Sequence, residues 1–175
     1  MVGMIQDKIK QSIEAADILY HRLVLLVGET GSGKTAVLRD VADELGVSVV
    51  NVNLEISSAL LELTARQRAL RLPEILGEIA DKAGSPVILD NMEILFDKDL
   101  KQDPLRLLQG ISRNRTVVAS WNGKYSAGRL LYAETGHPEY RSYDLVDALI
   151  ERLPSTRQKT AERQDKDEIQ RPYPI

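Results

Sequence analysis

The stretch LVLLVGETGSGKTAVLRD, residues 23–40, decides the fold of this chain. It starts as a continuous apolar run of strand length, passes through a glycine-rich loop and ends in a segment of helical character. The loop, residues 28–35, matches G-x-x-x-x-G-K-[ST], whose glycines allow tight turns that point successive backbone N–H groups at phosphate oxygens. A helix beginning near Lys34 adds its dipole to that anion site. The stretch therefore predicts a phosphate-binding loop between a buried strand and a helix.

The phosphate contacts are expected from the loop and the first helical residues. Lys34 is predicted to lie against the β- and γ-phosphates, and the Thr35 hydroxyl is predicted to ligate Mg²⁺. The expected ligands are therefore ATP and Mg²⁺. The residues predicted to contact the nucleotide are Gly28, Glu29, Thr30, Gly31, Ser32, Gly33, Lys34, Thr35, Ala36 and, from a later strand, Asn122.

The metal of such a site also needs a carboxylate at the end of a neighbouring buried strand. VILD, residues 87–90, has this pattern, with an acid where the apolar run ends. Asp90 is predicted to hold the Mg²⁺ shell through water. The alternative reading of Asp90 is a solvated strand end or a helix cap.

Hydrolysis depends on a group that orients or deprotonates the attacking water. In many ATPases of this architecture a glutamate directly follows the metal-binding aspartate, and here Asn91 takes that position. An amide orients water by hydrogen bonds but takes no proton. Glu93 and Glu55 are the two candidates for the catalytic carboxylate, and weak or no intrinsic hydrolysis is the third reading.

The end of the fourth predicted strand should approach the γ-phosphate. Ser120 and Asn122 are candidates to sense that phosphate, or they simply begin the following loop. Arg113 and Arg115 precede the same strand, at its other end. They are expected to form a surface pair, with a finger offered to a neighbouring subunit as the alternative.

Strands that alternate with helices predict an α/β fold with a mostly parallel sheet between two helical layers. The sheet order is expected to be 5-1-4-3-2, without a helical lid domain. Residues 1–153 are expected to form one phosphate-loop NTPase domain, and the polar tail, residues 154–175, is expected to be disordered. Strands are expected at 23–27, 47–53, 87–90 and 116–121, a hairpin around 129–133, and helices at 4–20, 35–45, 55–63, 73–83, 104–112 and 144–153.

Composition narrows the class of protein. The 175 residues suffice for one domain with a sizeable core. The absence of cysteine excludes disulfides and cysteine-based zinc sites. A net charge of −3 weighs against a dedicated DNA-binding module. No apolar run is long enough to span a membrane and no export signal precedes the domain, so a cytoplasmic location is expected.

Four segments together resemble a known family. GETGSGKT (28–35) is generic, but VILDNMEILF (87–96), DPLRLLQGISRNRTVVASW (103–121) and GHPEYRSYD (136–144) resemble the BrxF family of small phosphate-loop proteins from type 3 BREX bacteriophage-resistance systems. The resemblance covers about residues 20–145. It implies a compact domain similar to AAA+ ATPases, with Lys34, Thr35 and Asp90 at the nucleotide site.

The same resemblance implies partners. They are the larger BREX components, among them a large ATPase, a DNA methyltransferase and a phosphatase-like protein, and the chain is also a candidate homo-oligomer. Contact with DNA, direct or through those partners, is a further expectation. The chain departs from fuller AAA+ proteins at Asn91 and in the expected absence of a lid, which favours nucleotide-dependent assembly over independent motor activity. The alternatives are a non-enzymatic DNA-binding adaptor and a small-molecule kinase.

Overall fold

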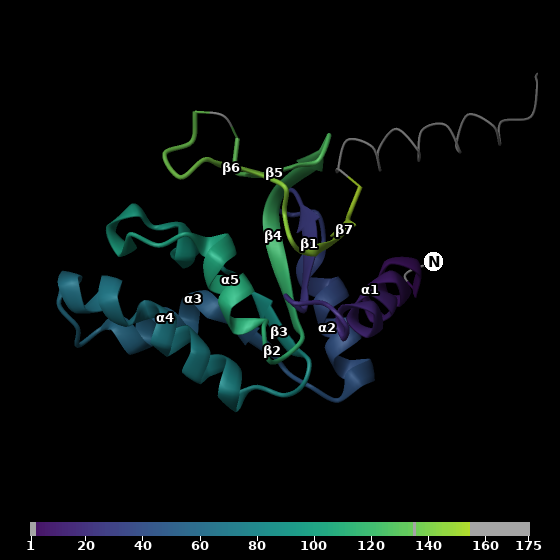
Figure 1. Ribbon diagram of the computed structural model, residues 1–175, viewed down its shortest axis with the longest axis horizontal. Coiled ribbons are helices and arrows are strands. Elements are labelled where there is room, and N and C mark those ends of the chain that lie inside the picture. Colours follow the sequence, from purple (N-terminus) through teal and green to yellow (C-terminus); the bar gives the residue numbers. More distant parts are fainter. Residues whose placement is uncertain (1–2, 135, 155–175) are drawn as a thin grey trace, which may run out of the picture.

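The computed structural model describes residues 3–134 and 136–154 of the chain. At its centre lies a parallel sheet with the strand order β2-β3-β4-β1-β7 (Figure 1). With β7 as the fifth strand, this is the predicted order 5-1-4-3-2. The strands of this sheet are β1 (Leu23–Gly28), β2 (Val49–Asn51), β3 (Val87–Asp90), β4 (Val117–Ser126) and β7 (Leu149–Arg152).

Helices cover both faces of the sheet, as Figure 1 shows. Val24 and Leu26 of β1 pack into a core with Leu38 from one helical layer, whereas Leu23 and Leu25 face the opposite core. Every residue of β1 is buried, because a strand between two helical layers has no solvent face. The first layer consists of α1 (Gly3–Ala16) and α2 (Lys34–Leu45), and the second of α3 (Val52–Leu60), α4 (Ala65–Lys82) and α5 (Pro104–Ile111).

The strand register brings polar residues to one edge of the sheet. Gly28, at the end of β1, pairs with Asn122 of β4. Asn51, at the end of β2, pairs with Asp90 of β3. Since the carboxyl ends of parallel strands share one edge, the phosphate loop, Asp90 and Asn122 meet there.

The C-terminal end of the domain differs from the sequence prediction. Residues 144–153 were expected to form a helix, but β6 (Arg141–Asp144) ends there and residues 149–152 form β7 beside β1. Leu149 packs toward the α1–α2 core and Ile150 toward the opposite core. Pairing with β7 satisfies the backbone groups that β1 would otherwise leave open at its edge. The helix prediction was therefore wrong, and this segment supplies the fifth strand.

Several elements have other bounds than expected. α3 starts at Val52 instead of 55, so the strand expected at 47–53 is shortened to Val49–Asn51. α1 stops at Ala16 instead of continuing to residue 20, and Tyr20 is exposed. α4 begins at Ala65 instead of 73, behind a capping box in which Thr64 and Gln67 satisfy each other's backbone N–H groups. Pro73 therefore lies inside a helix rather than in its first turn.

β4 continues beyond the parallel sheet and forms an antiparallel extension at the edge that carries the phosphate loop. β4 continues past Asn122, forms a hairpin with β5 (Arg129–Tyr132), and β5 pairs with β6 (Figure 1). The turn residues Ala127 and Gly128 both have positive φ, as a type I′ hairpin turn requires. A Cβ on Gly123 would lie 1.8 Å from the Leu131 carbonyl oxygen, so only glycine fits this crossing. The predicted hairpin around 129–133 is confirmed.

Two short 3₁₀ turns, η1 (Glu93–Phe96) and η2 (Lys98–Leu100), connect β3 to α5. In the part of the chain that the structure describes, no helix combines the length and apolar character needed to cross a bilayer. The tail prediction, apart from Pro154, lies outside the described residues, and the domain limits stay a prediction.

Candidate nucleotide-binding site

The phosphate loop joins β1 to α2 through left-handed glycines. Gly31 has a φ of 78° and Gly33 a φ of 101°, which other residues adopt only under strain. Gly33 is also the residue before α2, and no side chain caps that helix. The N–H groups of its first turn therefore face the loop uncovered by a side chain, as an anion site requires.

Lys34 lies inside the loop with a side chain that is 6% exposed. Its Nζ donates hydrogen bonds to the carbonyl oxygens of Gly28 at 2.9 Å and Glu29 at 2.8 Å. Burial lowers the pKa of Lys34, whereas the charges of nearby carboxylates, first that of Asp90, act in the opposite direction. A phosphate anion placed here would stabilise the ammonium in place of those neutral carbonyls.

Asp90 connects the loop to the sheet. Its Oδ2 accepts a hydrogen bond from Thr35 Oγ1 at 2.7 Å, and its Oδ1 accepts one from Ser120 Oγ at 2.7 Å. Asp90 is 4% exposed, and this pairing holds the carboxylate in one orientation. Ser120, a candidate phosphate sensor, thus points at the acid.

The oxygen atoms at this position fit Mg²⁺, which prefers hard oxygen ligands and retains several waters. A Thr35 hydroxyl and an Asp90 carboxylate 2.7 Å apart are the pair that such an ion needs from the protein beside phosphate oxygens. Within residues 3–134 and 136–154, no cluster of three or more His, Asp or Glu side chains is placed to hold a metal.

Glu93 is held between two amides. Its Oε1 accepts a hydrogen bond from Asn122 Nδ2 at 2.6 Å, and its Oε2 accepts one from Asn53 Nδ2 at 2.7 Å. The Asn53 Oδ1 atom in turn accepts a bond from the backbone N–H of Ile94 at 2.8 Å, which fixes the start of η1. Strands β2, β3 and β4 thus converge on one carboxylate.

Asn91 explains why a glutamate two residues later reaches the site. Its φ of 53° is left-handed, a conformation that asparagine tolerates better than most residues. Its carbonyl oxygen accepts a bond from the Asn53 N–H at 2.8 Å. The chain therefore turns directly after β3, and the Glu93 side chain comes back toward Asn122. Glu55, the other candidate, is exposed on α3 and makes none of these contacts.

A cavity of about 470 Å³ surrounds the loop. Of the predicted nucleotide contacts, Gly28, Glu29 and Ser32 do not line it. Gly28 is packed tightly, since a Cβ there would lie 2.5 Å from Ser32 Oγ. The sequence did not predict two residues of the site: Asn53, which bonds to Glu93, and Arg39, which lines the cavity. The lining residues are Thr30, Gly31, Gly33, Lys34, Thr35, Ala36, Arg39, Asp90, Asn91, Glu93 and Asn122.

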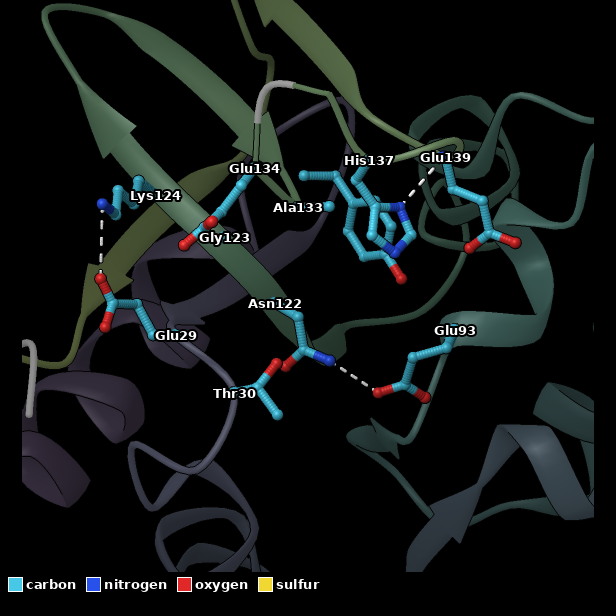
Figure 2. Close-up of a pocket in the computed structure, with 11 residues that line it drawn as sticks. Glu29, Thr30, Glu93, Asn122, Gly123, Lys124, Ala133, Glu134, His137 and Glu139 are labelled. Atoms are coloured by element: carbon cyan, nitrogen blue, oxygen red, sulfur yellow. Dashed lines mark hydrogen bonds and ion pairs between the residues drawn. The ribbon is translucent and has the colours of Figure 1, made fainter.

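A second cavity of about 750 Å³ adjoins the first and shares Thr30, Glu93 and Asn122 with it. Figure 2 shows it between the phosphate loop and the antiparallel extension, with Glu134 beside Gly123 and Glu139 beyond His137. Tyr132 also lines it, and burial, with the charge of Glu93, raises the pKa of this phenol so that it stays neutral. Four glutamates line this second cavity, which makes it rich in carboxylates: Glu29, Glu93, Glu134 and Glu139.

Arg113 and Arg115 lie before β4, at the edge away from this site. Arg115 forms an ion pair with Asp81 of α4, and Arg113 lies over the Tyr20 ring at 4.7 Å from its centroid. Neither contributes to the site within the described chain. Their role toward a neighbouring subunit stays a prediction.

Comparison with known proteins gives one family and several distant relatives. The sequence model of the ATPase family associated with various cellular activities (AAA) matches residues 24–118, more than half of the chain. tRNA dimethylallyltransferase 1 of Citrifermentans bemidjiense is 30% identical over 152 residues, which are 81% of this chain and 47% of that protein.

Two solved structures are similar at lower identity. Caenorhabditis elegans PCH-2 is 15% identical with a TM-score of 0.47, over 96% of this chain and 48% of its own. A DNA replication initiation factor is 13% identical with a TM-score of 0.46, over 92% of this chain and 49% of its own. The chain spans about half the length of each of these proteins.

Proposed function

The chain belongs to the AAA family of ATPases, and from this premise we propose that it binds ATP with Mg²⁺ at residues 28–35, hydrolyses it slowly and uses nucleotide state to control assembly with partner proteins. The observation that carries the proposal is the position of Glu93. Its carboxylate lies beside the phosphate loop, and both of its oxygens are bonded to amides.

Each of four side chains in the site has a distinct role in this proposal. Lys34 exchanges its two backbone carbonyl partners for β- and γ-phosphate oxygens. Thr35 and Asp90 hold Mg²⁺, which when bound neutralises charge that develops on the phosphates. Asn122 lies where a strand end can hydrogen-bond the γ-phosphate.

Glu93 supplies the base for hydrolysis. A water attacks the γ-phosphorus, the bond to the bridging oxygen breaks, and the proton of the water passes to the Glu93 carboxylate. In the observed arrangement Asn53 and Asn122 occupy both Glu93 oxygens. Each of these oxygens keeps a further lone pair that can accept a bond from water, so the two amides position the base without blocking it.

ATP turnover by the purified protein tests this assignment. Glu93→Gln keeps the size and hydrogen-bonding capacity of the side chain but removes the base, so turnover should fall at least about tenfold while ATP still binds. Glu55→Gln, on exposed α3, is the matched control and should keep the wild-type rate. If wild type, Glu93→Gln and Lys34→Ala all turn over ATP equally, the protein is a binder and not an enzyme.

We also propose that the partners are BREX components, as the four resembling segments imply, and that the assembly works in the cytoplasm. The support for these partners is the resemblance of residues 87–96, 103–121 and 136–144 to that family. Light scattering of the protein with a phosphatase-like or large ATPase partner should show a mass that rises with ATP and Mg²⁺. Lys34→Ala should abolish the rise, and one unchanged mass in all samples would contradict the assembly role.

A second function, phosphoryl transfer to a small molecule, is favoured by one observation. The 750 Å³ cavity opens onto Glu93 and Asn122, where an acceptor hydroxyl could stand. A transfer screen against nucleosides and amino sugars would support it by a labelled product. The DNA-adaptor alternative gains nothing from this cavity, because its glutamates would repel nucleic-acid phosphates.

A further inference from the structure

The antiparallel extension carries a lysine toward the phosphate loop. The parallel pairing of β4 with β1 ends at Asn122, and β4 continues as part of the hairpin. Lys124 follows two residues later, so it projects from the same face of the strand as Asn122. The sheet extension thus places a cation beyond the residue that faces the γ-phosphate end of the site.

Lys124 is paired with the phosphate loop itself. Its Nζ lies 3.4 Å from Oε1 of Glu29, the second residue of the loop, and Figure 2 shows the two side chains facing each other. The Lys124 side chain is 61% exposed and that of Glu29 is 36% exposed. Ion pairs this exposed are weak, so a stronger anion nearby can take the lysine from its partner.

A continuous space connects Lys124 to the nucleotide site. Lys124, Glu29 and Thr30 line the same 750 Å³ cavity, which shares Thr30, Glu93 and Asn122 with the cavity around the phosphate loop. A flexible lysine side chain can therefore turn from Glu29 toward Asn122 without crossing packed protein.

The charge balance of the site leaves room for another cation. Lys34 and Arg39 are the cations among the residues that line the loop cavity, and Asp90 and Glu93 are carboxylates in the same wall. A triphosphate adds several negative charges to them.

We propose that Lys124 is a phosphate-contacting residue in cis, which leaves Glu29 and binds the γ-phosphate when a nucleoside triphosphate enters. Glu29 holds the lysine in the absence of that phosphate. Because ADP lacks the γ-phosphate, Lys124 gives the site its preference for ATP over ADP. The inference rests on the proposed nucleotide site and adds a determinant of specificity to it.

Equilibrium binding of fluorescent ATP and ADP analogues, both with Mg²⁺, tests the inference without relying on turnover. Lys124→Met removes the charge and keeps the length of the side chain. It should weaken ATP binding about tenfold, the loss expected for one charge-assisted hydrogen bond, and change ADP binding less than about twofold. Glu29→Gln should tighten ATP binding selectively, because it frees the lysine.

The double variant separates this role from local charge neutralisation. If Lys124 binds the γ-phosphate, Glu29→Gln with Lys124→Met should bind ATP as weakly as Lys124→Met alone. If Lys124 only masks the Glu29 charge, the single variant should weaken ATP and ADP equally and the double variant should restore wild-type affinity. That result, or no change in either affinity, would overturn the inference.

Two controls complete the experiment. Lys98→Met removes an exposed lysine of η2, outside both cavities, and should leave the ATP-to-ADP ratio unchanged. Lys34→Ala reports on the proposed function, since wild type that binds ATP no better than Lys34→Ala would mean failure of the nucleotide site itself. Far-ultraviolet circular dichroism of every variant excludes a change of fold.

Discussion

The phosphate loop and the antiparallel extension face each other across the site but are built in different ways. Lys34 bonds to carbonyl groups five and six residues away, so the loop holds its own shape. The extension depends on distant partners, since Trp121, Phe96 and Tyr132 pack together and Trp121 Nε1 donates to the Leu131 carbonyl at 3.0 Å. The difference teaches that the shape of the phosphate loop is a local property of this chain, whereas the shape of the cavity beside it depends on tertiary packing.

The extension is also fastened to the segment before α5. Tyr143 Oη donates to Asp103 Oδ1 at 3.0 Å, and Arg141 Nη2 donates to the Gln102 carbonyl at 2.8 Å. Damage to these contacts should therefore disturb the second cavity more than the loop. The following changes test this separation, from the largest expected effect to the smallest.

Trp121→Ala should have the largest effect, on stability. The indole is 1% exposed, and truncating a buried aromatic side chain costs about 3–5 kcal/mol in the free energy of unfolding. Urea denaturation followed by circular dichroism measures it. The exposed Tyr20→Ala is the matched control, with an expected change within about 0.5 kcal/mol. Equal losses for the two variants would mean that the extension is not held by its aromatic packing.

Lys34→Ala should abolish the phosphate-binding function of the loop and leave the structure of the antiparallel extension unchanged. ATP affinity should fall about 100-fold, because a buried ammonium no longer meets the phosphates. Titration calorimetry with ATP and Mg²⁺ measures the loss. The fluorescence of the aromatic cluster should stay unchanged. Normal ATP binding by the variant would show that the loop is not part of the nucleotide site.

Asn122→Ala tests the junction between the two regions. Glu93 would keep Asn53 as its only amide partner among those observed, so turnover should fall about tenfold through poorer positioning. ADP affinity should change less than about twofold, because ADP lacks the γ-phosphate that Asn122 is proposed to contact. Parallel losses of turnover and ADP binding would show a general distortion of the site.

The raised pKa of Tyr143 predicts a small loss of folding stability at high pH. Burial, with the charge of Asp103, raises the pKa of Tyr143 to about 12, above its unfolded value near 10. A raised folded pKa stabilises the protein below pH 10, and this contribution is lost as the pH rises from about 10 to 12. The loss should be about 1 kcal/mol after allowance for solvent screening. Tyr143→Phe should lack this part of the pH dependence in urea titrations between pH 9 and 12, and identical curves would contradict it.

Much of the fold could be predicted from local patterns. The motif at residues 28–35 predicts a phosphate loop, and the apolar run ending at Asp90 predicts a buried strand. The βαβ alternation predicts a parallel sheet, and the strand order was expected from the order common to nucleotide-binding sheets. Residues 149–152 could not be assigned in this way. A four-residue apolar-to-polar segment has no period that separates a strand from a helix, and the open edge of β1 decided between them.

The candidate site likewise has one part that local sequence determines and one part that tertiary structure determines. The sequence by itself determined the phosphate loop, because its residues are neighbours in the chain and glycine geometry sets their shape. It named Asn91 and Glu93 but gave no reason to join Glu93 to Asn53, which is distant in sequence. Only the tertiary structure brought the ends of β2, β3 and β4 to one edge, with Asn91 turning Glu93 between two amides. A carboxylate is positioned by hydrogen bonds from distant strands, and strand register, rather than any local pattern, decides which bonds can form.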